Sequence, residues 1–168
     1  RWSPSYKEKD EAIKEKFLST YQAALAEQLG DWKHEPKSLM ALIILLDQMP
    51  RNMFRGDKRA FEADNLALDY CLYGLEHGLD KKLCMIERVF FYHPLEHSEQ
   101  LEMQELSVKE FQNLDNEYSA TDYVESTSNA LHWAKEHYDI VKAFGRFPHR
   151  NKVLGRDSTA EEKRFLLD

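Results

Sequence analysis

The hydrophobic pattern is densest from Leu39 to Leu46, where eight consecutive residues carry no polar side chain. A helix that is apolar all round lies in the core of a domain or in a membrane. Eight residues rise only about 12 Å as a helix, whereas a bilayer needs roughly 20 residues. The pattern therefore predicts a central core helix. Because Pro50 disfavours helical geometry in the residue before it, we expect regular helix to end near Gln48.

Six further segments have the spacing of amphipathic helices, with charged residues between apolar ones. The first should end at Gly30, Pro94 suits the first turn of the fifth predicted helix, and Ser158–Glu161 form a capping box before the last. The six segments cover residues 5–29, 58–77, 81–92, about 95–117, Thr121 or Asp122 to about Phe144, and a short stretch ending in Phe165, Leu166 and Leu167.

Two of these predicted helices have unusual faces. Residues 58–77 carry a row of small side chains, which would let another helix approach closely: Ala60, Ala63, Ala67, Cys71 and Gly74. Residues 121–144 carry two adjacent apolar rows, which predicts a helix that is mostly buried. One row is Leu131, Ala134, Tyr138 and Val141, and the other is Trp133, His137, Ile140 and Phe144.

The pattern as a whole predicts an all-α fold of about seven helices, stacked as antiparallel helical hairpins. The chain contains only six Gly and five Pro residues, which favours long helices over a fold with many turns. At 168 residues, the simplest organisation is a single helical domain covering residues 1–168.

Charge and cysteine content narrow the classes of partner and compartment. The net charge of −7 argues against nucleic acid, because affinity for phosphate backbones comes from clustered Lys and Arg. No signal peptide or membrane span is visible, so we expect a cytoplasmic protein without a membrane partner. Cys71 and Cys84 are expected to be buried free thiols. The chain starts at Arg1 rather than Met, so we expect an N-terminal piece to be missing.

Polar residues gather in three clusters at predicted helix ends. The first contains Asp47, Gln48, Pro50, Arg51, Asn52 and Arg55. The second is the segment His93–Glu99. The third contains Arg146, His149, Arg150, Asn151 and Arg156.

The charges of these clusters suggest that they meet. Residues 140–156 contain five Lys or Arg residues and no acidic residue, whereas the predicted helix 95–117 is strongly acidic. Arginine forks form strong bidentate pairs with carboxylates. We therefore predict that the first and third clusters converge on Glu96 and Glu99, and that Arg51 lies near one of these two carboxylates.

Two interpretations of this assembly remain open. It can be a structural network, in which Arg, Asn and His donors satisfy the carbonyl groups that helix ends leave unpaired. It can also be a pocket for an anion or small ligand, with His97 or His149 beside the arginines. The candidate ligand-binding residues are Arg51, Asn52, Arg55, Glu96, His97, Glu99, Arg146, His149, Arg150 and Asn151.

The segment His93–His97 matches the H-x-x-E-H pattern of inverted zinc peptidases. In those enzymes both histidines project from one continuous helix. Pro94 should place His93 at or before a helix start, so we predict neither a metal site nor a cofactor. A looser alternative, a divalent-metal hydrolase centred on Glu96, His97 and Glu99 with Asp47, stays open.

Three long motifs resemble one known family: Leu45–Gly56, Pro94–Glu99, and Phe144–Asn151 followed by Leu154–Arg156. They are similar, in the same order, to the bacterial domain-of-unknown-function family 924. The resemblance implies a tetratricopeptide-like right-handed helical array and supplies no activity. The family usually begins with a Phe-Trp-Phe-type segment, whereas this chain opens at Arg1-Trp2. His93 stands where the family commonly has an apolar residue, which further weakens the zinc-peptidase interpretation.

The leading functional hypothesis is a binding module for a small anionic ligand or a protein segment, in keeping with tetratricopeptide-like folds. The metal-dependent hydrolase and a purely structural polar cluster are the alternatives.

Overall fold

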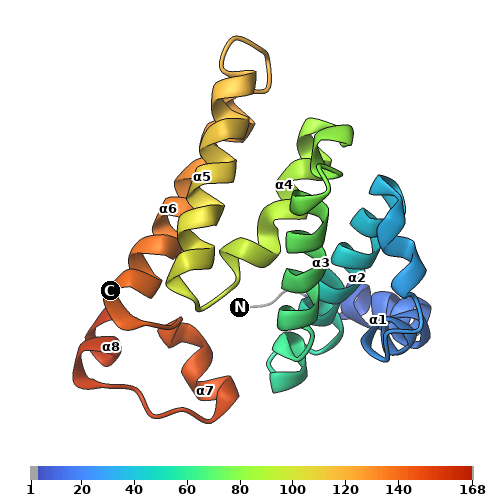
Figure 1. Cartoon of the computed structure of the whole chain (residues 1–168). Helices are drawn as coiled ribbons and strands as arrows, with labels where there is room; N and C mark the ends of the chain where they lie inside the picture. The colour runs from blue at the N-terminus through green and yellow to red at the C-terminus, as the bar shows by residue number, and fades with distance from the viewer. Residues whose placement is uncertain (1–3, 168) are drawn as a thin grey trace. The chain divides into compact units, whose positions relative to one another are not determined.

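The computed structural model describes residues 4–167, and every regular element within that range is helical (Figure 1). The described residues form eight α-helices, where about seven were expected, and consecutive helices pack as antiparallel neighbours, which confirms the all-α prediction. They are α1 (Pro4–Leu25), α2 (Pro36–Met53), α3 (Asp64–Glu76), α4 (Met85–Glu96), α5 (Leu101–Tyr118), α6 (Val124–Phe144), α7 (Asn151–Leu154) and α8 (Ala160–Phe165). Short 3₁₀ turns occupy Gly30–His34, Lys58–Phe61, Asp80–Lys82 and Pro148–Arg150.

The contacts divide the chain into two compact units, Arg1–Pro94 and Leu95–Asp168. A division by contacts does not decide whether the two units fold together or separately. The single domain over residues 1–168 therefore stays a prediction. The tetratricopeptide-like array also stays a prediction. Within the described residues, no helix is both long and apolar enough to cross a membrane.

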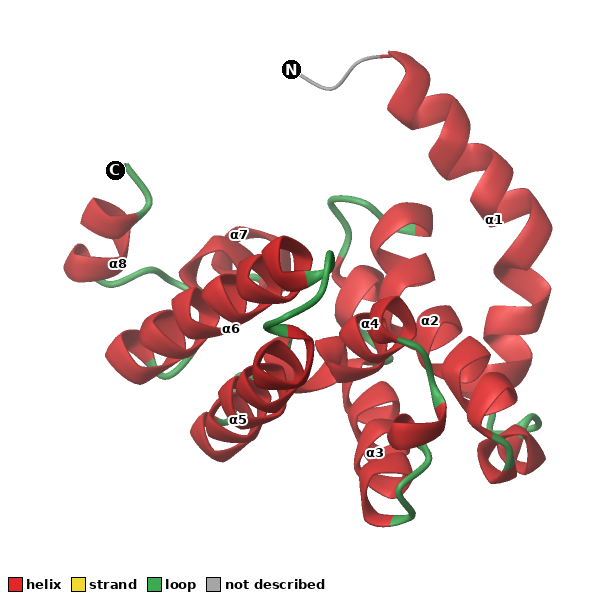
Figure 2. Ribbon diagram, turned by 90° about the horizontal axis from the view of Figure 1, so that it is seen from above, coloured by secondary structure: helices red, strands yellow, loops and turns green. Residues whose placement is uncertain are grey.

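Helix α2 is the core of the first unit, as its apolar run predicts. In Figure 2, α1 lies on one side of α2 and α3 on another, and both pack against it. Leu39, Leu42, Ile43 and Leu46 have no exposed surface. Burying a side chain of this size contributes roughly 1.5–3 kcal/mol, so α2 supplies much of the stability of this unit.

The predicted end of α2 near Gln48 is wrong, because the helix continues through Pro50 to Met53. Proline removes one helical hydrogen bond and disfavours the geometry of the preceding residue. Pro50 and Met53 are both buried, however. The apolar burial gained by continuing the helix outweighs the local preference of proline, as tertiary packing commonly does.

Pro94 also lies inside a helix, near the end of α4, and α5 begins only at Leu101. The prediction that Pro94 opens the fifth helix is therefore wrong. The last turn of α4 is capped by Gln104, whose Nε2 donates to the carbonyl oxygens of Glu96 and Ser98 at 2.7 and 2.6 Å. A side-chain donor here satisfies carbonyl groups that a helix end leaves unpaired.

The row of small residues on α3 does admit close neighbours, as predicted. Ala67, Cys71 and Gly74 are all buried. An added Cβ at Gly74 would lie 2.4 Å from Cζ of Phe91 on α4 and 2.7 Å from Cδ2 of Leu39 on α2. Gly74 is therefore a point of close approach between α3 and its neighbours α2 and α4.

The prediction that α6 is mostly buried is wrong. One apolar row, including Leu131, Ala134 and Val141, is buried against the neighbouring helix α5. The second row is only partly covered: Trp133 keeps 52% of its surface exposed, whereas His137, Ile140 and Phe144 are half-buried. Apolar spacing along a helix shows which side chains share a face, but not whether that face has a neighbour.

Several predicted boundaries change because of local capping. The segment 58–77 divides: Asp57 accepts from the Arg59 N–H at 2.9 Å and starts a 3₁₀ turn, and α3 begins afterwards, at Asp64. The last capping box is shifted by one residue and pairs Thr159 with Glu162. Helix α7 was not predicted. Both cysteines are free, but Cys84 is exposed, so only Cys71 fits the expectation of a buried thiol.

Candidate functional site

The candidate residues fall in both units, and each group is described within its own unit. In the first unit, Arg51 makes a bidentate pair with Asp64, from Nη1 to Oδ1 at 2.9 Å and from Nη2 to Oδ2 at 3.1 Å. Its Nη1 also donates to the Asp47 carbonyl at 2.6 Å. The prediction had chosen Glu96 or Glu99 as the partner of Arg51 and had missed Asp64. Arg51 therefore ties the end of α2 to the start of α3.

Asn52 and Arg55 converge on one carboxylate of α1, that of Asp10. Asn52 Nδ2 donates to Oδ1 at 2.9 Å, and Arg55 donates through Nε at 2.7 Å and through Nη2 at 3.0 Å. The Arg55 hydrogen bonds hold the pKa of Asp10 below its ordinary value, against a smaller opposing effect of burial. Asp10 was not predicted, because it is one of many charged residues on the polar face of α1.

A pocket of about 290 Å³ opens beside this trio, between the first turns of α1 and the end of α2. Two of the predicted ligand-binding residues line it, Asn52 and Arg55. Its lining carries two cationic and two anionic side chains together with an aromatic ring: Tyr6, Lys7, Asp10, Glu11, Asn52, Met53 and Arg55. Within residues 4–167, Lys7 makes no ion pair, so its ammonium group is available to a ligand.

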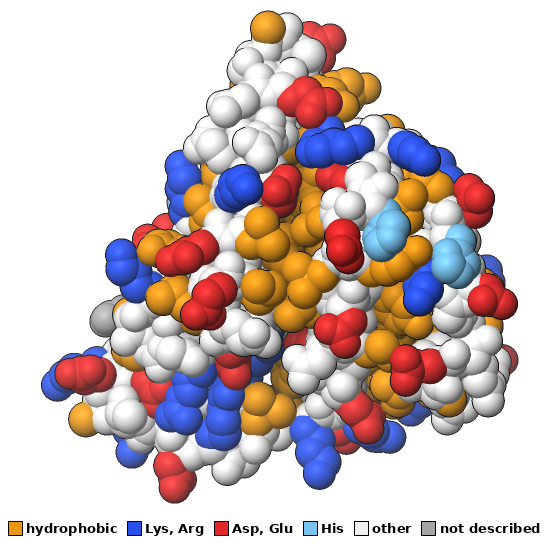
Figure 3. Space-filling view, viewed as in Figure 1, with side chains coloured by type: hydrophobic (Ala, Val, Ile, Leu, Met, Phe, Trp, Pro, Cys, Tyr) orange, Lys and Arg blue, Asp and Glu red, His pale blue; other side chains and the backbone are white. Residues whose placement is uncertain are grey.

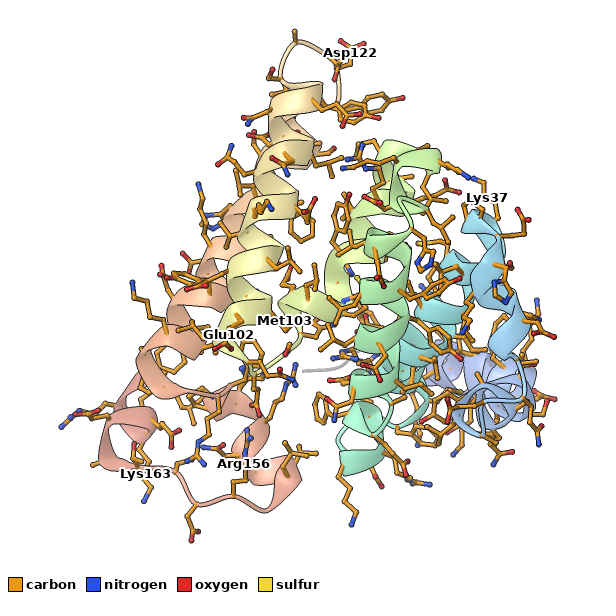
Figure 4. The ribbon with its side chains drawn as sticks, in the orientation of Figure 1. Lys37, Glu102, Met103, Asp122, Arg156 and Lys163 are labelled. Carbon is orange, nitrogen blue, oxygen red and sulfur yellow. The ribbon has the colours of Figure 1, made fainter. Side chains whose placement is uncertain are left out.

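In the second unit, Glu99 gathers three donors, and this part of the predicted convergence is present. Arg156 approaches it bidentately, at 2.7 Å from Nη1 to Oε2 and 2.9 Å from Nη2 to Oε1, and the Phe147 N–H donates at 2.8 Å. Burial is the largest single effect and raises the pKa of Glu99, but the hydrogen bonds from Arg156 and the Phe147 N–H and the charges of Arg156 and Arg150 together outweigh it, so the pKa lies below its ordinary value. Figure 4 shows Arg156 on the segment that joins α7 to α8.

Glu162 on α8 is a second carboxylate at this corner, and it was not among the candidates. Arg146 donates to it through Nε at 2.6 Å and Nη2 at 2.9 Å, and Asn151 Nδ2 lies 3.2 Å away. The hydrogen bonds from Arg146 are the largest cause that lowers its pKa to about 2. The signal that could have found it is the capping motif, because the Glu of a capping box points back toward its N-cap.

Arg150 and Asn151 complete the corner, where Lys and Arg side chains gather over α7 and the segment to α8 (Figure 3). Arg150 is buried, donates to the His97 carbonyl at 3.0 Å, and places its guanidinium 4.6 Å from the centre of the Phe147 ring. Asn151 accepts from Arg156 Nε at 2.9 Å. The arrangement links the segment between α4 and α5 to α7 and α8 through charged hydrogen bonds.

Two histidines lie in the same corner. His137 Nδ1 is 2.8 Å from the Trp133 carbonyl and 3.2 Å from Oε1 of Glu96, so this nitrogen carries the proton when the ring is neutral. Burial lowers the pKa of His137, and the charges of His97 and Arg150 lower it further. The pKa of His149 is also lowered, by partial desolvation and by the charge of Arg150, although the residue is exposed and the effect is screened by solvent. The neutral forms are therefore favoured in the folded protein.

These two histidines predict a loss of stability in mild acid. A lowered folded pKa means that the unfolded chain binds protons first, so the free energy of unfolding should fall as the pH drops below about 6.5. Replacing both residues, as His137→Gln with His149→Gln, should reduce the slope of stability against pH between pH 7 and 5, measured by urea unfolding. His132→Gln, on the exposed side of α6, should leave the slope unchanged. An unaltered slope in the double variant would contradict the assignment.

The side chains of the H-x-x-E-H segment do not gather with other described side chains into a group that could hold a metal ion. Within residues 4–167, no group of three or more His, Cys, Asp or Glu side chains lies so that it could hold a metal ion. His93 Nδ1 is 3.1 Å from Nε2 of Gln48, and the Glu99 carboxylate is occupied by Arg156 and the Phe147 N–H. Among the described residues, therefore, no group of side chains supports the metal-dependent hydrolase alternative.

Comparison with known proteins gives two matches. The family described as "Bacterial protein of unknown function (DUF924)" matches residues 1–168. The solved structure described as "Structure of Protein of Unknown Function ATU0120 from Agrobacterium tumefaciens" is similar, with a TM-score of 0.84 and 36% identity over 95% of this chain and 84% of that chain. No curated protein matches. The motif resemblance is thus confirmed, and neither description states an activity.

Proposed function

Because the chain belongs to the DUF924 family of bacterial proteins of unknown function, its function has to be argued from its own side chains, and we propose that it is a binding module for a small anionic ligand. The proposed site is the pocket between α1 and α2. The observation that supports it is the meeting of Lys7, Asn52 and Arg55 in a pocket of about 290 Å³. Ligand pockets usually measure roughly 300–1,000 Å³, so a ligand of few atoms fits best.

The charges of the pocket suggest how an anion would bind. Asp10 already holds the Arg55 fork through Nε and Nη2, and it also accepts from Asn52. This pairing fixes the arginine in place before any ligand arrives, which lowers the entropy lost on binding. A carboxylate or phosphate would bind Lys7 directly and share the donors of Arg55 with Asp10. The acidic neighbours make the affinity modest, because the carboxylates of Asp10 and Glu11 formally cancel the two positive charges of the pocket.

The corner around Glu99 and Glu162 is better explained as a structural network. Two of its arginine forks are taken by carboxylates, Arg146 by Glu162 and Arg156 by Glu99. Arg55 is paired bidentately with Asp10 as well, so the difference between the two sites lies in the additional cation: Lys7 lines the pocket of the first unit and makes no ion pair within residues 4–167. We therefore assign the candidate residues Glu99, Arg146 and Asn151 to holding the C-terminal segment, and we place the ligand in the first unit.

The proposal is tested by titration with inorganic phosphate and with succinate, followed by calorimetry at constant ionic strength. The parent protein should bind at least one of the two anions, and Lys7→Gln combined with Arg55→Gln should weaken that binding at least tenfold. Lys9→Gln, a neighbouring surface lysine outside the pocket, should bind like the parent. Binding should also raise the melting temperature of the parent more than that of the double variant, because a ligand that binds only the folded state stabilises it.

Two results would overturn this assignment. The first is an absence of binding to the parent by either anion at millimolar concentration. The second is equal binding by the parent and the double variant, which would place the anion elsewhere on the protein. Capture of an acidic protein segment through the same Lys7 and Arg55, without binding of the free anions, would support the partner-segment alternative instead.

A further inference from the structure

The charged residues that line the pocket between α1 and α2 balance one another. Lys7 and Arg55 are cationic, and Asp10 and Glu11 are anionic. Two of the four are already matched, because Asp10 accepts hydrogen bonds from Arg55 Nε at 2.7 Å and from Arg55 Nη2 at 3.0 Å. One cation, Lys7, and one anion, Glu11, remain, and within residues 4–167 neither of them makes an ion pair.

Lys7 and Glu11 lie on the same face of α1, one helical turn apart. Residues four apart in a helix have Cβ atoms about 5–6 Å from each other. A direct pair between these two would be weak, because a helix favours the acidic residue on the N-terminal side of the basic one, and here the order is reversed. Both residues are exposed, so water weakens their direct attraction further. A ligand that offers each of them a group of opposite charge can therefore bind both.

An aromatic ring and a thioether complete the lining of the pocket. Tyr6, in the first turn of α1, keeps 51% of its surface exposed, whereas Met53, at the end of α2, is buried. The face of a tyrosine ring attracts a cationic group within about 6 Å. Methionine adapts to apolar groups of irregular shape. These two side chains favour a ligand that carries an ammonium group and an apolar part over a purely inorganic anion.

We propose that the anionic ligand of this pocket is a zwitterion, a free α-amino acid with an apolar side chain. The inference rests on the proposed function, in which Lys7 and Arg55 bind the carboxylate of the ligand. Glu11 accepts hydrogen bonds from its ammonium group, and the apolar side chain lies against Tyr6 and Met53. A zwitterion leaves neither Lys7 nor Glu11 unmatched, whereas a simple anion is repelled by the Glu11 carboxylate.

Calorimetric titration with leucine, N-acetyl-leucine and leucinamide near neutral pH tests this inference. The three compounds share one apolar side chain, but N-acetyl-leucine lacks the positive charge and leucinamide lacks the negative charge. The parent protein should bind leucine about tenfold more tightly than either derivative, because each derivative loses one charged hydrogen-bonding group.

Single substitutions assign the two charges of the ligand to their partners. Glu11→Gln should lower the affinity for leucine to that for N-acetyl-leucine, and should leave the affinity for succinate equal or higher, because a repelling carboxylate is removed. Lys7→Gln should remove the preference for leucine over leucinamide. Glu8→Gln is the matched control, since it removes the same charge as Glu11→Gln from an exposed position of α1 outside the pocket. It should bind all of these compounds like the parent.

The possible failures of the two proposals differ. Equal binding of leucine and N-acetyl-leucine by the parent would overturn the zwitterion but leave the anion-binding function intact. Equal weakening of leucine and succinate binding by Glu11→Gln would also overturn the zwitterion, because Glu11 would then shape the pocket instead of binding an ammonium group. An absence of binding by leucine, N-acetyl-leucine and succinate alike would overturn the proposed function itself.

Discussion

Replacement of Gly74 by alanine is expected to lower the free energy of unfolding by about 2–3 kcal/mol. The direction is the reverse of what helix propensity alone predicts, because alanine is favoured over glycine within a helix by about 1 kcal/mol. The added Cβ would lie 2.4 Å from Phe91 Cζ and 2.7 Å from Leu39 Cδ2. Phe91 and Leu39 have no exposed surface, so neither side chain can move without disturbing the core.

Urea unfolding followed by circular dichroism measures this effect. Gly30→Ala is the matched control, since the nearest atom to its added Cβ is the Tyr70 hydroxyl at 4.0 Å, and stability should be unchanged or slightly raised. In a second arm, Phe91→Leu should cost less in the Gly74→Ala background than in the parent, because the smaller side chain makes room. Parent-like stability of Gly74→Ala would show that α3 and α4 are less closely packed than described.

The Glu99→Ala variant should lose about 2–3 kcal/mol of stability. The substitution removes the acceptor for two Arg156 donors and for the Phe147 N–H. Breaking a fully buried pair costs roughly 3–5 kcal/mol. The expected loss is smaller here because the Glu99 and Arg156 side chains keep 27% and 23% of their surfaces exposed to screening solvent.

A double-mutant cycle with Arg156→Met separates the pair from its surroundings. The two substitutions together should cost less than the sum of the single ones, because each alone leaves its partner unmatched. Glu105→Ala, an exposed position on α5, is the control and should change stability by less than about 0.5 kcal/mol. Additive losses in the cycle would mean that Glu99 and Arg156 act separately.

The elements that the sequence predicts best are those whose signal is local. Eight consecutive apolar residues admit only a buried helix, and α2 is that helix. The row of small residues that ends in Gly74 predicts that another helix approaches closely. Small side chains on one helix face permit such an approach whichever helix packs there. The type and rough extent of the long helices follow from such patterns.

The ion-pair partner of a side chain and the burial of a helix face are harder to predict, because both depend on residues far away in the chain. Arg51 had many carboxylates available, and nothing local distinguishes Asp64 from Glu99. Pro50 shows the same limit in another form, since burial of the residues after it overrides a preference that is correct for short peptides. Trp133 belongs to a row of α6 that resembles a core face in sequence, and only the fold shows that this side chain keeps half of its surface exposed.

The forked pairs at the C-terminal corner have a consequence for how relatives of this protein can vary. Arg156 uses both terminal nitrogens on the two oxygens of Glu99, and Arg146 uses Nε and Nη2 on those of Glu162. Lysine conserves the charge but offers a compact point donor in place of a planar fork. A lysine at either position would lose one of the two arginine hydrogen bonds, and only the remaining donors, the Phe147 N–H on Glu99 and Asn151 Nδ2 on Glu162, would be left beside it. Replacement of Arg146 or Arg156 by lysine, although it conserves the charge, should therefore be poorly tolerated at the C-terminal corner.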